Sequence, residues 1–162
     1  MRVALRNPQG FTMIEAISAI VIMTIISVLA GMGLIQIANG YAFAKKNAVI
    51  AQQAQIALTR LSKELSALQY VSESPAPTST SLTYVRDGAT HTIAWAGVKQ
   101  QPLTLDGDIL IDKVENFSLT YYNKYNDPSP TTYSSATAII QITLELKAGA
   151  DTTVAFTDRV AI

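Results

Sequence analysis

The sequence contains no cysteine and a single histidine, His91. The missing cysteines exclude a disulfide framework and thiolate metal sites, although they leave the cellular compartment open. His91 stands between two threonines in an expected strand, without a second histidine or a cysteine to complete the usual metal sites or nucleophile pairs. We therefore expect no catalytic residue, no metal site and no cofactor, and we expect His91 to be an ordinary exposed strand residue.

Charged residues are also scarce. They make up 15% of the chain, the formal net charge is zero, and the basic residues are scattered. A nucleic-acid-binding protein would present a basic patch, so no nucleic-acid partner is expected. Most of the apolar surplus lies before residue 40 of the 162, which leaves room for one membrane segment and one modest domain.

The apolar segment Ala16–Ile35 carries no charged residue. As a helix, its roughly 20 residues would span about 30 Å, the thickness of the hydrocarbon core of a bilayer. Arg2 and Arg6 precede the segment closely, whereas Lys45 and Lys46 follow at a distance, which favours a cytoplasmic N-terminus. The sequence thus predicts a single membrane crossing.

Three interpretations of this segment differ in where the chain is cut. A secretory signal would use Ala42-Phe43-Ala44, but its apolar core is typically about 7 to 15 residues long and follows a basic region, whereas Glu15 precedes this one. The uncut signal anchor of a periplasmic binding module would explain the length and would leave Glu15 to snorkel at the interface. Neither interpretation gives a reason for a carboxylate at the membrane, where a central acidic side chain costs about 2.5 to 3.5 kcal/mol.

The third interpretation starts from the residues ahead of the apolar segment. A short basic leader ends at Gly10, and the next residues read FTMIE, from Phe11 to Glu15. This order resembles the class III signal of type IV pilins and pseudopilins. The resemblance implies that a prepilin peptidase cuts between Gly10 and Phe11 on the cytoplasmic side, methylates the Phe11 amine and leaves the helix on the mature protein. Residues 1–10 would be the leader, and residues 11–38 the transmembrane or filament-core half of a long helix.

Within this resemblance Glu15 is interpreted as an assembly residue. Cleavage would create a cationic amine on Phe11, and Glu15 of one subunit would neutralise the Phe11 amine of a neighbour in the filament. Two charges that are costly in lipid would then become one pair. Glu15 also argues against the subunit that caps the extreme tip of such filaments, because that family member characteristically lacks the glutamate.

The helical pattern continues past the membrane. From Tyr41 to Tyr70 there is no proline, and apolar residues recur at three- and four-residue spacings, with Arg60, Lys63 and Glu64 turned away. These apolar positions are Phe43, Ile50, Ala54, Leu58, Leu61, Leu65 and Leu68. Together with the membrane segment they predict one helix of roughly 60 residues, whose amphipathic half, residues 39–71, must bury its stripe. The resemblance implies packing on the chain's own sheet; a coiled-coil seam is the alternative, although the stripe covers few heptads.

Residues 72–162 show the periodicity of strands. Pro75 and Pro77 end the helix, and the segments that follow are rich in Thr, Val, Ile, Leu and aromatic residues. The expected strands are Ser81–Arg86, Thr90–Ala96, Leu103–Leu105, Asn116–Asn123, Ala138–Leu146 and Thr153–Val160, with a turn at Asp87-Gly88. The predicted fold class is therefore α+β, a long N-terminal helix packed on an antiparallel β-sheet domain.

Two polar segments leave alternatives open. Asp106-Gly107-Asp108 has the ingredients of a calcium loop, but calcium takes about six or more ligands, so a tight turn is favoured. The segment Asn123–Ser135 is a polar loop in which Tyr125 and Tyr133 either contact a partner or rim the sheet.

We interpret the chain as a minor pilin or pseudopilin, a structural subunit of a type II secretion pseudopilus or a type IV pilus. Asp112–Tyr122 resembles the lead into the central sheet of J-type minor pseudopilins and W-type minor pilins, and Phe156–Val160 resembles their last strand. The resemblance implies three kinds of partner: prepilin peptidase, other minor and major pilins or pseudopilins, and the inner-membrane assembly platform. It also implies one crossing of the inner membrane, with the C-terminal domain in the periplasm. A major pilin is a further alternative, against which the absent cysteine pair counts.

Overall fold

The computed structural model describes residues 10–126, 128–130, 132–149 and 152–162. The chain divides into two compact units, one ending at Ala42 and the other formed by Phe43–Ile162. The helix α1 (Met13–Ser66) contributes residues to both units, and the strands all belong to the second.

The residues of α1 that belong to the first unit are strongly apolar. An 18-residue window of this helix reaches a mean hydropathy of 2.4 with none of it buried, so the helix is long and apolar enough to cross a membrane. Every large apolar side chain from Met13 to Ile37 is exposed. This agrees with the predicted membrane segment Ala16–Ile35. The predicted divisions at residues 10 and 38 stay predictions, and the leader before Gly10 lies outside the described residues.

The helix ends earlier than its apolar pattern predicted. The predicted helix ran to residue 71, but α1 stops at Ser66. Tyr70 and Val71 instead form a short strand, β1 (Tyr70–Val71), which pairs with Val85 and Tyr84. An aromatic and a β-branched residue fit a pleated sheet better than a helix, and strand pairing here overrides the helical spacing.

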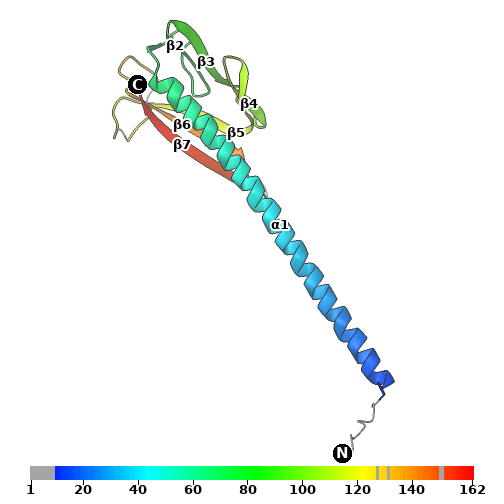
Figure 1. The fold of residues 1–162 in the computed structure, drawn as a ribbon. Coiled ribbons are helices and arrows are strands. Elements are labelled where there is room, and N and C mark those ends of the chain that lie inside the picture. The colour runs from blue at the N-terminus through cyan, green and yellow to red at the C-terminus, as the bar shows by residue number, and fades with distance from the viewer. Residues whose placement is uncertain (1–9, 127, 131, 150–151) are drawn as a thin grey trace, which may run out of the picture. The chain divides into compact units, whose positions relative to one another are not determined.

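The second unit is built around a seven-stranded sheet in which each strand pairs with the next along the chain, always antiparallel (Figure 1). After β1 the strands are β2 (Ser81–Arg86), β3 (Ala89–Trp95), β4 (Gln101–Leu105), β5 (Asp108–Tyr122), β6 (Ile139–Lys147) and β7 (Thr153–Ala161). The predicted antiparallel sheet and α+β class are therefore confirmed. The predicted turn at Asp87-Gly88 joins β2 to β3, with positive φ angles of 50° and 77°.

β5 differs most from the prediction, which began it at Asn116. The strand begins at Asp108 and pairs first with β4 and then with β6, with an irregular register between Val114 and Asn116. Polar residues at Asp112, Lys113 and Glu115 break the alternation of apolar residues, so sequence periodicity detected the second half of the strand alone. A bulge of this kind lets one long strand bend and serve two neighbours.

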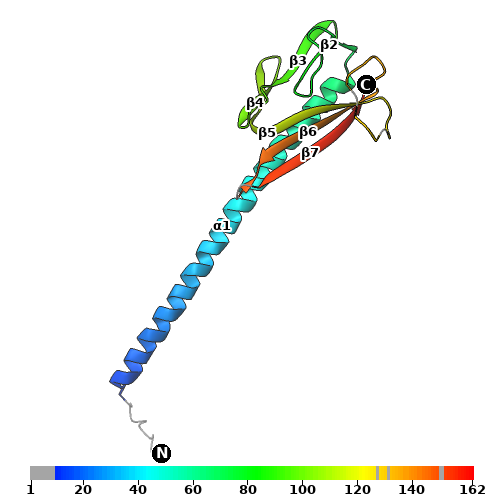
Figure 2. The same cartoon turned by 180° about the vertical axis from the view of Figure 1, so that it is seen from behind.

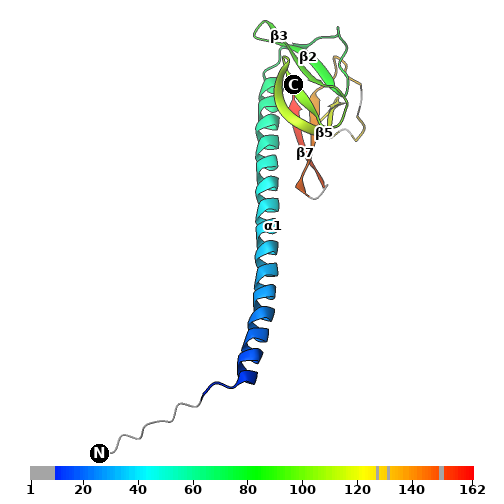
Figure 3. The ribbon, with the colours of Figure 1, turned by 90° about the vertical axis from the view of Figure 1, so that its right-hand side faces the viewer.

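The core lies between one face of the sheet and the last turns of α1, which lies across β5, β6 and β7 (Figures 1 and 2). Leu61 and Leu65 are almost fully buried, as are Phe117 and Leu144, which pair across β5 and β6. Figure 3 shows the sheet curling along one side of this part of the helix. From Ile50 onward the predicted apolar stripe packs on the chain's own sheet, with Ala54, Leu58, Leu61 and Leu65 buried and Ile50 and Leu68 partly buried. Phe43, the first residue of the predicted stripe, is instead 46% exposed.

Candidate functional site

The predicted cleavage position lies just before the helix. Gly10 and Phe11 precede the first helical residue, Met13, and the Phe11 side chain is 73% exposed. A Cβ atom built on Gly10 would meet no atom within 4 Å. The fold of this chain therefore does not require glycine at position 10. A requirement for a residue without a side chain would have to come from another protein that binds this segment.

Glu15 has a local role that the sequence analysis missed. Its Oε2 accepts hydrogen bonds from the Thr12 backbone N–H at 3.4 Å and from the Thr12 hydroxyl at 3.2 Å. Thr12 is the residue before the helix and Glu15 is the third residue within it, so the pair forms one half of a capping box. The carboxylate also lies at the positive end of the helix dipole. The spacing Thr-x-x-Glu ahead of an apolar run is a sequence signal that would have revealed this cap.

The hydroxyl groups in the apolar part of α1 are satisfied within the helix. Ser18, Thr24 and Ser27 donate to the carbonyl groups four residues earlier, at 2.7 to 2.8 Å. In hydrocarbon an unsatisfied polar group costs several kcal/mol, and these bonds remove that cost. Among the charged residues of α1, Glu15 is the one that adjoins the apolar segment on its N-terminal side.

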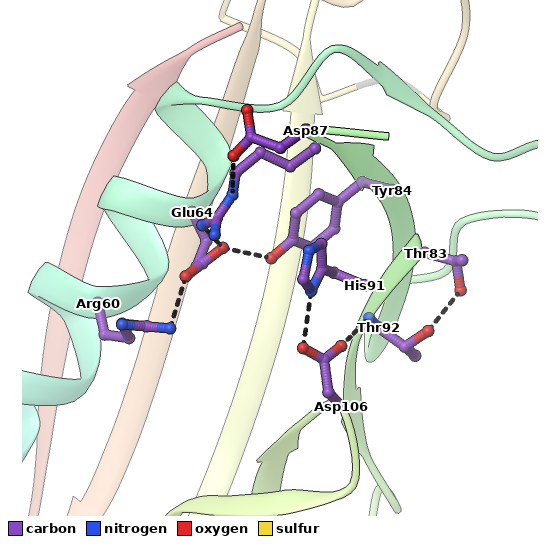
Figure 4. A network of polar contacts seen from close by, with 9 residues as sticks. Arg60, Glu64, Thr83, Tyr84, Asp87, His91, Thr92 and Asp106 are labelled. Carbon is purple, nitrogen blue, oxygen red and sulfur yellow. Dashed lines mark hydrogen bonds and ion pairs between the residues drawn. The ribbon is translucent and has the colours of Figure 1, made fainter. Parts of the chain in front are cut away.

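A second polar constellation lies inside the second unit (Figure 4). We call it the Glu64 cluster: Arg60, Glu64, Tyr84 and Arg86. Glu64 Oε1 pairs with Arg60 at 2.9 Å, while Oε2 accepts hydrogen bonds from the Tyr84 hydroxyl at 3.1 Å and from Arg86. Arg60 and Glu64 are one helical turn apart on α1, and Tyr84 and Arg86 are two apart on β2, so each pair shares one face of its element.

The position of Glu64 differs from the prediction, which had its side chain point away from the apolar face. Glu64 is 3% exposed, whereas Arg60 and Lys63 are exposed as predicted. A buried carboxylate is costly unless it is paired and hydrogen-bonded, and Glu64 has three such partners. The nearest sequence signal was Arg86, a cation placed on a strand two residues after a tyrosine, but its spatial partner could not be read from spacing.

Next to this cluster His91 is not an ordinary exposed strand residue, which is a second correction. Its side chain is 21% exposed and stacks on the Tyr84 ring at 5.6 Å between centroids. Its Nδ1 lies 2.7 Å from Asp106 Oδ2, and Asp106 Oδ1 accepts the Thr92 backbone N–H at 2.8 Å. The register places His91 beside Tyr84 on neighbouring strands.

The electrostatics of these residues follow from burial and from their partners. Burial first, and the nearby Glu64 carboxylate second, raise the pKa of Tyr84 above its ordinary value. Desolvation acts to raise the pKa of Asp106, but the hydrogen bonds from His91 and from the Thr92 backbone outweigh it, and the pKa of Asp106 is lowered. Tyr84 thus stays a neutral hydrogen-bond donor to Glu64, and Asp106 stays an acceptor.

The candidate calcium loop is a turn. Asp106 and Gly107 join β4 to β5 with positive φ angles of 56° and 86°, and both Asp106 oxygens already accept hydrogen bonds. Across the described residues, no group of three or more His, Cys, Asp or Glu side chains is placed to hold a metal ion. The favoured tight turn is confirmed.

The two tyrosines of the loop Asn123–Ser135 have different environments. Tyr133 packs edge-on against Tyr121 at 5.6 Å between ring centroids and adjoins the core. Tyr125 is 71% exposed. Of the two, Tyr133 belongs to the rim of the fold, and Tyr125 is the one that is accessible to a partner.

Comparison with protein families adds an independent finding. The family model described as the prokaryotic N-terminal methylation motif matches residues 5–31. The match includes Gly10, Phe11 and Glu15 together with the first part of the apolar segment. Comparisons with curated proteins and with solved structures gave no match. The match covers the N-terminal part of the chain and supports the resemblance of that part to type IV pilin-like proteins, at the start of a helix that is long and apolar enough to cross a membrane.

Proposed function

We propose that the chain is a minor pilin or pseudopilin that is cut between Gly10 and Phe11, methylated on the Phe11 amine and incorporated into a filament through Glu15. One observation carries the proposal. The methylation motif at residues 5–31 coincides with the start of an exposed apolar helix of membrane length, and Glu15 is its third residue. Each of these features alone is common, but their coincidence is typical of type IV pilin-like proteins.

The partners follow from the same proposal. In this proposal prepilin peptidase cleaves the chain, other minor and major pilins or pseudopilins contact it in the filament, and the inner-membrane assembly platform binds it during assembly. Its second unit, Phe43–Ile162, is compact by itself, as expected of a domain that folds in the periplasm. The likeness of Asp112–Tyr122 and Phe156–Val160 to J-type and W-type minor subunits favours a minor role in a secretion pseudopilus or a pilus.

Glu15 acts in this proposal as the counter-charge of a neighbour. In the isolated chain its Oε2 is bound by two neutral donors of Thr12, which satisfy lone pairs but leave the negative charge in place. A cationic amine on Phe11 of an adjacent subunit would neutralise that charge when both enter the apolar filament interior. The cap meanwhile holds the carboxylate at the start of the helix, one turn from its own Phe11.

The first test is N-terminal peptide mass spectrometry on membrane-extracted protein. We expect a mature chain that begins at Phe11 and carries the added mass of a methyl group on its amine. A start at Lys45 would establish a secretory signal cut after Ala42-Phe43-Ala44, and an intact Met1 would establish a plain anchor. Both of these results would overturn the proposal.

The second test separates charge pairing from capping at Glu15. Glu15→Gln removes the charge but keeps an oxygen that can accept the hydrogen bonds of Thr12, whereas Glu15→Ala removes both. Charge pairing predicts that both variants lose incorporation by on the order of 100-fold, because an unpaired buried amine costs several kcal/mol. Thr12→Ala, which removes one capping donor, should incorporate nearly normally.

These variants are measured in the same cells by gel shift for processing, by fractionation for membrane content and by crosslinking for incorporation. Processing and membrane content should be unchanged, because cleavage depends chiefly on Gly10 and the Glu15 variants make the segment no more polar. Normal crosslinking of Glu15→Gln, combined with a loss in both Glu15→Ala and Thr12→Ala, would show that the cap is what matters. Normal crosslinking of all three would remove any assembly role of Glu15.

A further inference from the structure

A groove in the second unit, with a volume of about 520 Å³, is lined by α1, β5, the end of β6 and the residue before β4. The described residues that line it include four lysines, Lys45 and Lys46 from α1, Lys113 from β5 and Lys147 from β6, and one acidic residue, Asp112. Its apolar lining includes Val49, Ile50 and Leu146. The lining thus combines basic and apolar side chains.

Three of these four lysines are not paired within the described part of the chain. No ion pair or hydrogen bond between described residues engages the side chains of Lys45, Lys46 or Lys113. All three residues are exposed. Clustered ammonium groups repel one another, so an anionic group bound among them would lower the free energy of the domain. The ligand that suits this groove combines an anion with an apolar body.

The position of these lysines along the chain indicates where such a ligand comes from. No charged residue occurs from Ala16 to Ala44, so Lys45 and Lys46 are the first charges after the apolar segment. They directly follow Tyr41 and Phe43, whose side chains are 71% and 46% exposed. Aromatic residues followed by lysines are typical of the membrane–water interface, where the headgroups of lipids lie.

From the groove and from this position together, we propose that the groove binds the headgroup phosphate of an anionic phospholipid from the leaflet in which the helix emerges. The phosphate lies among Lys45, Lys46 and Lys113, and the glycerol and upper acyl carbons contact Val49 and Ile50. Bound lipid would hold the second unit at the membrane surface until the subunit leaves the bilayer. This inference requires a membrane anchor but does not depend on cleavage at Gly10 or on Glu15.

The test uses the full chain purified in detergent and native mass spectrometry with added phosphatidylglycerol or phosphatidylcholine. We expect the wild-type chain to retain phosphatidylglycerol preferentially. The triple variant K45Q/K46Q/K113Q should lose that preference, because one basic residue near an anionic lipid contributes about fivefold in affinity and three contribute on the order of 100-fold at low salt. Inorganic phosphate and glycerol phosphate, which lack the apolar body, should not be retained.

The matched control is K63Q/K99Q/K124Q, which removes the same charge from three exposed lysines outside the groove. This control should keep the lipid preference. Equal losses in the two triple variants would mean general electrostatic attraction and would overturn the site, as would equal retention of the two lipids by the wild-type chain. A single variant, Gln53→Glu, places a negative charge in the same groove and should also weaken retention, which guards against a fold defect in the triple variant.

A photo-reactive residue at Val49 of the full chain in native membranes then identifies the occupant directly. A phospholipid adduct supports the proposal. An adduct with another subunit, without lipid, would mean that the groove docks a protein with an acidic surface, and the lipid proposal would be wrong. Circular dichroism of each purified variant shows whether it retains the fold.

Discussion

Replacement of Glu64 by glutamine is the sharpest test of how the second unit is held together. Glutamine keeps the size of the side chain and one oxygen that can accept from Tyr84, but it removes the negative charge that faces Arg60 and Arg86. The change therefore isolates the ionic part of the Glu64 cluster. We expect Glu64→Gln to fold and to be clearly less stable than the wild-type chain.

The size of the effect follows from the exposure of each partner. The Arg60 side chain is 56% exposed and one helical turn away, so its pair contributes about 0.3 to 0.5 kcal/mol. The Arg86 side chain is 27% exposed against 4% for Glu64, so this pair is only partly buried and its loss should cost more than the loss of the Arg60 pair but less than that of a fully buried pair. Because Arg86 also contacts Asp87 at 3.3 Å, part of its charge stays balanced, and we expect a Tm that is lower by several degrees.

The measurement is thermal unfolding of the full chain in detergent, followed by tryptophan fluorescence. Trp95 is the single tryptophan and is 8% exposed on β3, so it reports unfolding of the sheet. Arg60→Gln serves as the control and should change the free energy of unfolding by no more than about 0.5 kcal/mol. The double variant Glu64→Gln/Arg86→Gln should recover part of the loss, because it leaves no unpaired buried charge. A Tm for Glu64→Gln within about 2 °C of wild type would refute the reasoning.

Three further predictions concern the same unit. Leu61→Ala, at a fully buried position, should lower the free energy of unfolding by about 2 to 5 kcal/mol. The control Lys63→Ala, at an exposed position, should change it by less than about 0.5 kcal/mol. If Leu61→Ala has no effect, the apolar stripe faces another protein. Gly149→Ala would place a Cβ 2.4 Å from the Phe43 ring and should cost about 1 to 3 kcal/mol, and Phe43→Ala in the same chain should relieve most of that cost if the clash is its cause. Burial raises the pKa of the Tyr84 hydroxyl above its ordinary value of 10.0. The stability of the wild-type chain should therefore be intact below pH 10.0 and fall as the pH rises past 10.0. Tyr84→Phe should flatten this decline in alkaline unfolding curves, and an unchanged slope would show that Tyr84 is not its cause.

The parts of the fold that could be predicted are those where one signal acts alone. The exposed apolar run, the helical stripe around Leu61 and the strand Ser81–Arg86 each follow a single periodicity, and the structure has them where the sequence placed them. β4 and β5 were predicted too short. Pro102 lies within β4 beside a register shift, and the bulge after Val114 interrupts β5, so local backbone irregularity concealed residues that the neighbouring strands nevertheless pair.

The Glu64 cluster could not be predicted because its partners come from distant parts of the chain. A glutamate on a helix beside Arg60 and Lys63 looks like part of a solvated face, and pattern rules assign it there. Its burial depends on Tyr84 and Arg86, which reach it only after β2 has packed against α1. His91 was misjudged for the same reason, since Asp106 approaches it through the pairing of β3 with β4.

Two glutamates of α1, Glu15 and Glu64, differ in whether their own chain balances their charge. Glu64 is buried, but two arginines and a tyrosine of its own chain offset its charge and fill its lone pairs. Glu15 borders a segment of membrane length, and its two hydrogen bonds, both from Thr12, come from neutral donors at 3.2 and 3.4 Å. Neutral donors satisfy a carboxylate's lone pairs without neutralising its charge, so the cost of taking Glu15 into an apolar environment remains. Neutralisation would require a cation close to the start of the helix, and cleavage before Phe11 would supply one on every subunit. The Phe11 amine of one subunit could then pair with Glu15 of its neighbour, and Glu15→Gln, which keeps an acceptor for the cap and removes the charge, is the variant that decides the question.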